Sequence, residues 1–278
     1  MLNKGTRTIF TAQLRILFCI VLFEFLLFIF SGVSFSFLHA DPFFSLGADP
    51  ASWIVYGLNI PQFIIGHHWI GFSLDVGIIL LLLLLIRNPF NNRIALGLLV
   101  LLCIFYISLM GYLTHRNYQF GLFVVFIPFI FRKNINKFFA FEATRYFLLF
   151  FYFSAAFLKL SNNSLFAPAH FSHMLTAQFA PYFVESNTGV RTEVNLYLIN
   201  HITASYTLFL SSFLIEFIVV IGFFTKRFDK WLAVLILAFH IMSWLIMDIA
   251  PVGQVGFICL LFLCNSFRQN LAGSAKDI

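Results

Sequence analysis

Five ionisable side chains lie inside long apolar segments, and these are the residues with the greatest potential for chemistry. They are Glu24, Asp75, Lys159, Glu216 and His240. An ionisable group in hydrocarbon is costly unless it is paired or solvated, so each is a candidate site residue. With a helical rise of about 1.5 Å per residue, four of them come near the middle of a hydrocarbon core about 30 Å thick. Lys159 is expected nearer to the outer surface.

Lys159 shares one helical face with Tyr152, Ala155 and Ala156, which precede it at spacings of seven, four and three residues. Small residues on that face would let a neighbouring helix approach closely. Partial burial of the lysine beside them would favour the neutral amine, which can act as a base or a nucleophile. The alternative is a lysine whose flexible stem carries the ammonium group to the membrane surface.

Glu216 and His240 each have a hydroxyl group nearby on the same helix. Ser212 lies one turn before Glu216, and Ser243 lies one turn after His240. Both residues could therefore support a reaction at a polar interior site. The alternative is structural, with a buried acid bonded to its neighbours and a histidine that only joins two helices. The other two acidic residues are expected to be structural pairs.

The elements that carry these residues follow from the composition. The chain has 278 residues, of which 61% are hydrophobic, 10% are charged and 41 are phenylalanine. This composition excludes a soluble globule, a disordered chain, collagen and a disulfide-stapled secreted domain. We expect an all-α polytopic membrane protein, a bundle of about eight transmembrane helices. The apolar segments are 14–38, 64–86, 94–113, 119–131, 143–161, 204–224, 231–247 and 250–265.

The loop charges predict the orientation of these spans. Only Arg116 and Arg191 fall on one side, and fourteen basic residues fall on the other. These are Lys4, Arg7, Arg15, Arg87, Arg93, Arg132, Lys133, Lys137, Arg145, Lys226, Arg227, Lys230, Arg268 and Lys276. Basic residues collect in cytoplasmic loops, so eight spans with both termini cytoplasmic are expected. The same rule explains the net charge of +6, and no nucleic acid partner is expected.

No soluble domain fits between the segments, so residues 1–278 are expected to form a single membrane domain. The longest loop, 162–203, is predicted on the outer side as a possible cap over that face. Its aromatic and polar residues include His170, His173 and Tyr182. The four cysteines lie in apolar runs without a CxxC pair, and no HExxH or GxSxG motif occurs, so no metal site is expected.

Several segments together resemble one protein family. Tyr152–Leu160 (YFSAAFLKL) is similar to a helix of vitamin K-dependent γ-carboxylase and of its bacterial relatives, the HTTM (horizontally transferred transmembrane) family. Phe239–Leu245 resembles the family's FHxMN segment, and Gly253–Phe257 resembles the glycine-containing turn after it. Leu214–Glu216, ahead of a basic loop, resembles the family's acidic helix, and His115–Tyr118 resembles its NHxY loop.

This resemblance implies an enzyme that acts on a membrane quinol. By analogy with the carboxylase, Lys159 would be the base that deprotonates the quinol. His240 would stabilise a carboxylate or orient a substrate, and Glu216 would be a supporting acid. Tyr152 and Ala156 would contact the cofactor. A single lysine stands where the carboxylase has a lysine pair, and Ser243 replaces the asparagine of FHxMN.

The chain is therefore expected to be closer to short bacterial HTTM proteins than to a true carboxylase. The first functional hypothesis is a carboxylase-like, quinol-dependent lyase or oxidoreductase of the bacterial inner membrane, acting on a quinol or an exported peptide. The second is a non-enzymatic membrane partner in the maturation, export or immunity of a peptide toxin. The third is a proton-coupled transporter that uses the midplane carboxylates. The expected partners are the lipid bilayer and a lipid quinol or exported peptide.

Overall fold

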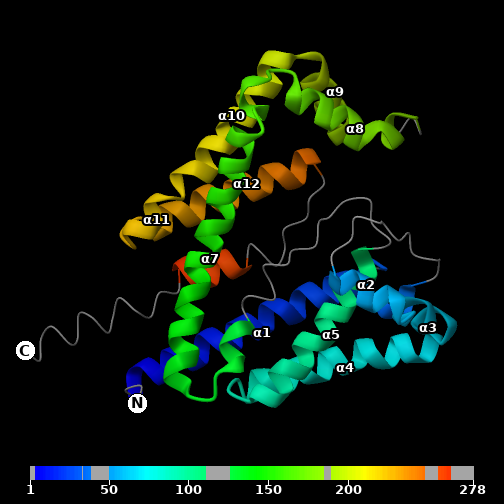
Figure 1. Cartoon of the computed structure of the whole chain (residues 1–278), viewed down its shortest axis with the longest axis vertical. Coiled ribbons are helices and arrows are strands. Elements are labelled where there is room, and N and C mark those ends of the chain that lie inside the picture. The colour runs from blue at the N-terminus through cyan, green and yellow to red at the C-terminus, as the bar shows by residue number, and fades with distance from the viewer. Residues whose placement is uncertain are drawn as a thin grey trace, which may run out of the picture. The chain divides into compact units, whose positions relative to one another are not determined.

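The protein is helical throughout the part of the chain that its computed structural model describes (Figure 1). That part consists of residues 4–32, 34–38, 50–110, 126–184, 189–247 and 256–263. Every regular element within these ranges is a helix, which confirms the predicted all-α class. A helix satisfies its own backbone hydrogen bonds, so it suits a chain this apolar.

The chain divides into two compact units, one running to Ala143 and the other from Thr144 to Pro251, with parts of the following segment assigned to each. The first unit contains α1 (Lys4–Phe30), η1 (Phe35–Phe37), α2 (Pro50–Gly57), α3 (Ile60–Gly66), α4 (His68–Arg87), α5 (Asn92–Met110), η2 (Ile127–Ile130) and the start of α7 (Asn134–Ser161). The second contains the rest of α7, η3 (Ser164–Phe166), α8 (His170–Val184), α9 (Val190–Asn200), α10 (Ile202–Ile218), α11 (Ile221–Phe224) and α12 (Asp229–Met247).

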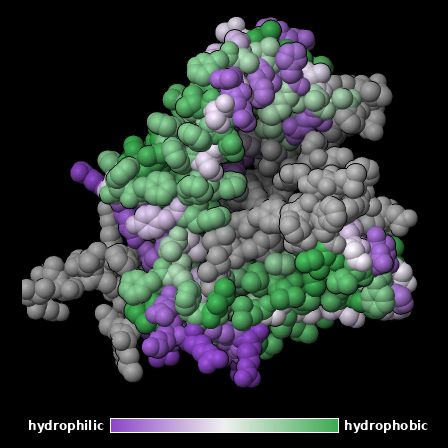
Figure 2. All heavy atoms as spheres, viewed as in Figure 1, coloured by the Kyte–Doolittle hydropathy of each residue, from purple (hydrophilic) through white to green (hydrophobic). Residues whose placement is uncertain are grey.

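Five stretches of the described chain are long and apolar enough to cross a membrane. They are Arg7–Phe37, His68–Arg87, Asn134–Ser161, Ile202–Phe224 and Asp229–Met247. Large apolar side chains lie on their surfaces: Phe30 and Phe224 are each 84% exposed, and Trp69 is 80% exposed. Figure 2 shows hydrophobic atoms spread over α4. Exposed apolar surface of this extent is typical of contact with lipid, so the chain is an integral membrane protein.

The five stretches coincide with five of the eight predicted segments. The segment 94–113 falls on α5, whose apolar part, Asn92–Ser108, is shorter than a full span. The segments 119–131 and 250–265 and the motif at 253–257 lie partly outside the described residues, and the motif at 115–118 lies wholly outside them. The acidic residues at 41, 49, 185 and 248 also lie outside them. The number of spans therefore stays a prediction.

One predicted boundary is wrong. The second apolar segment does not form one helix from residue 64, because the backbone leaves the helical region at His67, with φ −133° and ψ 74°. The ring of His67 bonds the carbonyl of Phe63 through Nδ1 at 2.9 Å, and a new helix starts at His68. The segment 162–203, predicted as a loop, is mostly helical, since it contains η3, α8 and α9.

Asp75 has a structural role in the first unit, as expected. Its buried carboxylate accepts hydrogen bonds from the hydroxyl of Ser34 at 2.8 Å and from the backbone N–H groups of Phe35 (3.2 Å) and Ser36 (2.9 Å). The hydroxyl of Ser36 also donates to it. These bonds secure the turn η1 against α4 and compensate the buried charge.

Gly71, one turn before Asp75, is required by this close approach. A Cβ atom at Gly71 would lie 2.6 Å from the carbonyl oxygen of Phe35, whereas nothing lies within 4 Å of one at Gly77 in the same helix. We expect Gly71→Ala to destabilise the protein by about 1–3 kcal/mol. Gly77→Ala should stabilise it by about 0.5–1 kcal/mol, because alanine is the better helix former. Thermal unfolding in detergent measures both, and a Gly71→Ala variant that melts at or above the wild type would contradict the prediction.

Candidate functional site

Lys159 and Glu216, two of the predicted site residues, form an ion pair in the second unit. The Nζ atom of Lys159 in α7 lies 2.7 Å from Oε2 of Glu216 in α10 and donates a second hydrogen bond to Ser212 Oγ at 2.9 Å. The Glu216 side chain is 5% exposed, and that of Lys159 is 22% exposed. Phe209 also contributes, since its ring centroid is 5.3 Å from Nζ. One face of α10 therefore surrounds the lysine ammonium group.

Tyr152 and His240 form a second buried pair in the same unit. The phenol oxygen of Tyr152 lies 2.5 Å from Nε2 of His240, and both residues are at most 5% exposed. This hydrogen bond joins α7 to α12 and occupies one nitrogen of the imidazole. The described hydrogen bonds link the candidate residues in two pairs, and none of them joins His240 to Lys159.

A cavity of about 560 Å³ opens beside the first pair. Lys159, His170, Ser212 and Ser243 supply polar groups to its wall, and the rest of the wall is mainly apolar and includes Met242. We call it the Lys159 cavity. The helices α7, α8, α10 and α12 all contribute to it. A cavity of this size and character is typical of a site for a small amphipathic ligand.

The other predicted site residues do not line this cavity. Tyr152 and Ala156 are 2% and 0% exposed, and neither they nor Glu216 and His240 belong to its wall. In this arrangement a ligand in the cavity would not touch Tyr152 or Ala156 directly. Glu216 acts on the cavity only through Lys159.

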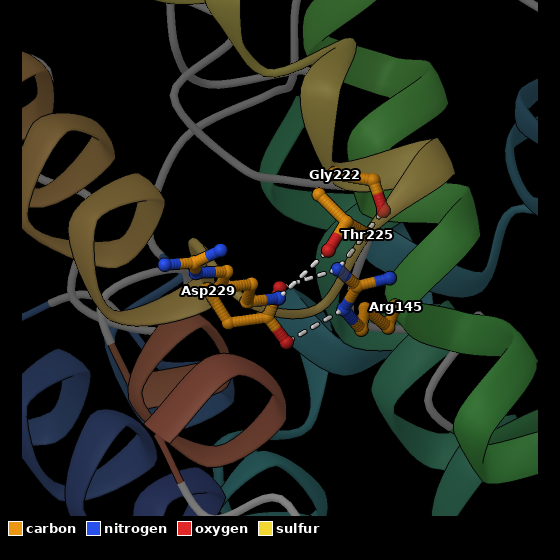
Figure 3. Close-up of polar contacts among 5 residues, drawn as sticks. Arg145, Gly222, Thr225 and Asp229 are labelled. Atoms are coloured by element: carbon orange, nitrogen blue, oxygen red, sulfur yellow. Dashed lines mark hydrogen bonds and ion pairs between the residues drawn. The ribbon is translucent and has the colours of Figure 1, made fainter.

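A third buried pair in the second unit, which the sequence pattern did not predict, joins Arg145 to Asp229 (Figure 3). Arg145 Nη2 lies 2.5 Å from Asp229 Oδ1, and Nε lies 3.2 Å from Oδ2, so the guanidinium group donates to both carboxylate oxygens. Nη2 also donates to the carbonyl of Gly222 at 3.0 Å. The side chains are 1% and 5% exposed.

Arg145 is one of the fourteen basic residues expected in cytoplasmic loops, but it lies inside α7 and joins this helix to α11 and α12 (Figure 3). A signal was present in the sequence, since Asp229 is the one acidic residue among the basic residues of the 225–230 segment. A lone carboxylate there would be expected to pair with a cation on another helix. Neither Arg145 nor Asp229 is in the wall of the Lys159 cavity, and their contacts link helices to one another.

The arrangement around the Lys159 cavity can perform two kinds of chemistry. The ammonium group of Lys159 can bind a polar or anionic group of a ligand, and the Lys159–Glu216 pair can store a proton and exchange it with that ligand. The family resemblance to γ-carboxylase and HTTM proteins stays a prediction. The chain matches no family model, no curated protein and no solved structure.

Proposed function

We propose that this protein is an HTTM-like membrane enzyme that binds a lipid quinol in the Lys159 cavity. The observation that carries the proposal is the position of Lys159: its amine lies at the wall of a largely apolar cavity of about 560 Å³ and is paired with a buried carboxylate. A quinol has the matching character, with a flat apolar ring, an apolar tail and hydroxyl groups. The resemblance of Tyr152–Leu160 to the carboxylase helix supports the same ligand.

The proton transfer in this proposal is confined to the Lys159–Glu216 pair. A lysine ammonium can pass its proton to the carboxylate at 2.7 Å, which leaves a neutral amine facing the cavity. That amine takes the proton of a ligand hydroxyl and becomes an ammonium again, while Glu216 keeps the first proton. The positive charge on Lys159 then faces the ligand oxyanion and stabilises it. Ser212 holds Nζ in position throughout.

The proposal includes a membrane topology. Eight spans with both termini in the cytoplasm, in a bacterial inner membrane, agree with the distribution of the basic residues, which is thirteen against two when Arg145, buried inside α7, is left out. In this topology the end of α7 that carries Lys159 lies toward the outer face. A lipid quinol would then enter sideways from the outer leaflet, and an exported peptide would meet the site from outside.

A non-enzymatic role in peptide maturation, export or immunity is the second candidate. A specific observation favours it: the candidate groups bond one another, Lys159 to Glu216 and Ser212, and Tyr152 to His240. Groups bonded in this way can serve mainly to hold three helices together. The two candidates differ in whether the Lys159 cavity binds a ligand.

A binding measurement on the purified full chain in detergent tests the proposal, with a short-chain benzoquinol and a short-chain naphthoquinol as probes. We expect Ser243→Phe, which places a ring in the wall of the cavity, to weaken binding at least tenfold. The double variant Lys159→Met, Glu216→Gln should weaken it by a similar factor, because it removes the ammonium group from the wall without leaving an unpaired charge. Lys230→Met, an exposed lysine of α12 outside the cavity, is the matched control and should bind like the wild type.

The proposal fails if neither quinol binds the wild type, or if Ser243→Phe binds as well as Lys230→Met. Either result would favour the non-enzymatic role. Retained binding by the Lys159→Met, Glu216→Gln variant would show that the cavity recognises only the apolar part of the probe, which would contradict the assignment of Lys159 as the reacting base.

A further inference from the structure

A second cavity, of about 680 Å³, lies in the first unit, at the point where α5 and α7 begin. Its polar wall differs from that of the Lys159 cavity, because it contains three cations and two amides. These are Arg93, Arg132, Lys137, Asn92 and Asn134. No carboxylate belongs to the wall. We call it the Lys137 cavity, and its composition is typical of an anion-binding site.

Lys137 is the least solvated of these cations, since only 2% of the residue is exposed. Its Nζ atom donates to Asn92 Oδ1 and to the carbonyl of Phe90 at 3.1 Å, both of which are uncharged acceptors. The rings of Phe90 and Phe129 lie 5.6 and 5.9 Å from Nζ. The contacts that the described residues make with Nζ are these two hydrogen bonds and two rings, and none of them is a carboxylate.

A buried cation without a counter-ion is unfavourable, and an anion from outside the chain would relieve the cost. The backbone adds to the attraction. Both α5, which begins at Asn92, and α7, which begins at Asn134, place their N-terminal ends at the cavity, and helix N-termini carry partial positive charge. The amide of Asn92 donates to the carbonyl of Phe131 at 2.8 Å, so it connects the two helix starts.

We propose that the Lys137 cavity binds the phosphate group of an acidic phospholipid. A phosphate accepts several charge-assisted hydrogen bonds at once, which suits two guanidinium groups and an ammonium group. The apolar surroundings favour a lipid as its source: Ile130 in the wall is 62% exposed, and the neighbouring Phe131 is 40% exposed. Hydrophilic atoms gather at this end of the first unit and adjoin the hydrophobic surface of α4 (Figure 2). Basic pockets at the ends of membrane helices bind acidic headgroups in this way.

The site belongs to the cytoplasmic leaflet if the predicted topology holds, because Arg93, Arg132 and Lys137 are among the fourteen basic residues on that side. The proposal itself does not depend on the quinol chemistry of the Lys159 cavity. It requires only that the cations and helix starts of the first unit face one headgroup.

Lipid retention by the purified full chain tests the proposal, with native mass spectrometry and thermal unfolding as the readouts. The probes are phosphatidylglycerol, phosphatidylcholine and inorganic phosphate. We expect phosphatidylglycerol to bind tightly and to raise the melting temperature, and phosphatidylcholine to do neither. Each of the exposed substitutions Arg93→Gln and Arg132→Gln should weaken phosphatidylglycerol binding about fivefold, and the double variant about 30-fold. Both side chains are exposed, so folding should survive.

Lys133→Gln is the matched control, because Lys133 is exposed and adjoins Arg132 but does not line the cavity. It should bind phosphatidylglycerol like the wild type. An equal loss in Lys133→Gln would point to diffuse surface charge and overturn the site. Equal retention of the two lipids would overturn it as well. If inorganic phosphate alone stabilises the wild type and displaces phosphatidylglycerol, the cavity is a site for free phosphate, and the lipid assignment is wrong.

Discussion

Replacement of Arg145 by alanine should destabilise the protein by about 3–5 kcal/mol. The substitution leaves the carboxylate of Asp229 buried without the guanidinium group that donates to both of its oxygens. The carbonyl of Gly222 loses its donor at the same time. A buried charge that has lost its partner is more costly than the absence of the whole pair, because its desolvation is no longer compensated.

Thermal unfolding in detergent and titration with a denaturing detergent measure this effect. Arg227→Ala is the matched control, since Arg227 lies in the turn between α11 and α12 and is exposed. It should change stability by less than about 0.5 kcal/mol. The double variant Arg145→Met, Asp229→Leu should recover much of the lost stability, because it replaces both charges with apolar groups. An Arg145→Ala variant as stable as Arg227→Ala would contradict the role assigned to this pair.

The long apolar runs made the helical class predictable, but not all of the helix boundaries. A hydropathy pattern marks where apolar residues begin, and a helix can begin earlier. The helix α7 starts at Asn134, although the apolar segment starts only at residue 143, because residues 134–142 contain few helix breakers. The break at His67 directly follows Gly66, the last residue of α3, but an isolated glycine in an apolar run is tolerated within helices and does not by itself predict a break.

The candidate site was predictable only along single helices. The spacing of Ser212 and Glu216 placed them on one face of α10, and the structure has both of them bonded to Lys159. The pairing of that face with α7 could not be derived, because contacts between residues 57 apart in sequence depend on how the helices pack. The same holds for Tyr152 and His240, which are 88 residues apart. The sequence identified polar residues in apolar helices, and packing decided their partners.

The Lys159–Glu216 pair should respond unequally to loss of its two members. Lys159→Met leaves the Glu216 carboxylate, which is 5% exposed, without a cation, and we expect a loss of about 3–5 kcal/mol. Glu216→Gln should cost only about 1 kcal/mol. In that variant Lys159, which is 22% exposed, keeps Ser212 as an acceptor, and its flexible stem can carry the ammonium group to a more polar position.

Thermal unfolding of the two single variants, the double variant and the Lys230→Met control tests this order. The double variant Lys159→Met, Glu216→Gln should be more stable than Lys159→Met alone, because the amide of glutamine is far less costly to bury than a carboxylate. Equal losses in the two single variants would mean that both charges depend equally on the pair, and a larger loss in Glu216→Gln would mean that the ammonium group is the charge more costly to leave unpaired. Burial would then favour the neutral amine of Lys159, so this result would contradict the predicted order of stabilities but not the role of Lys159 as a base.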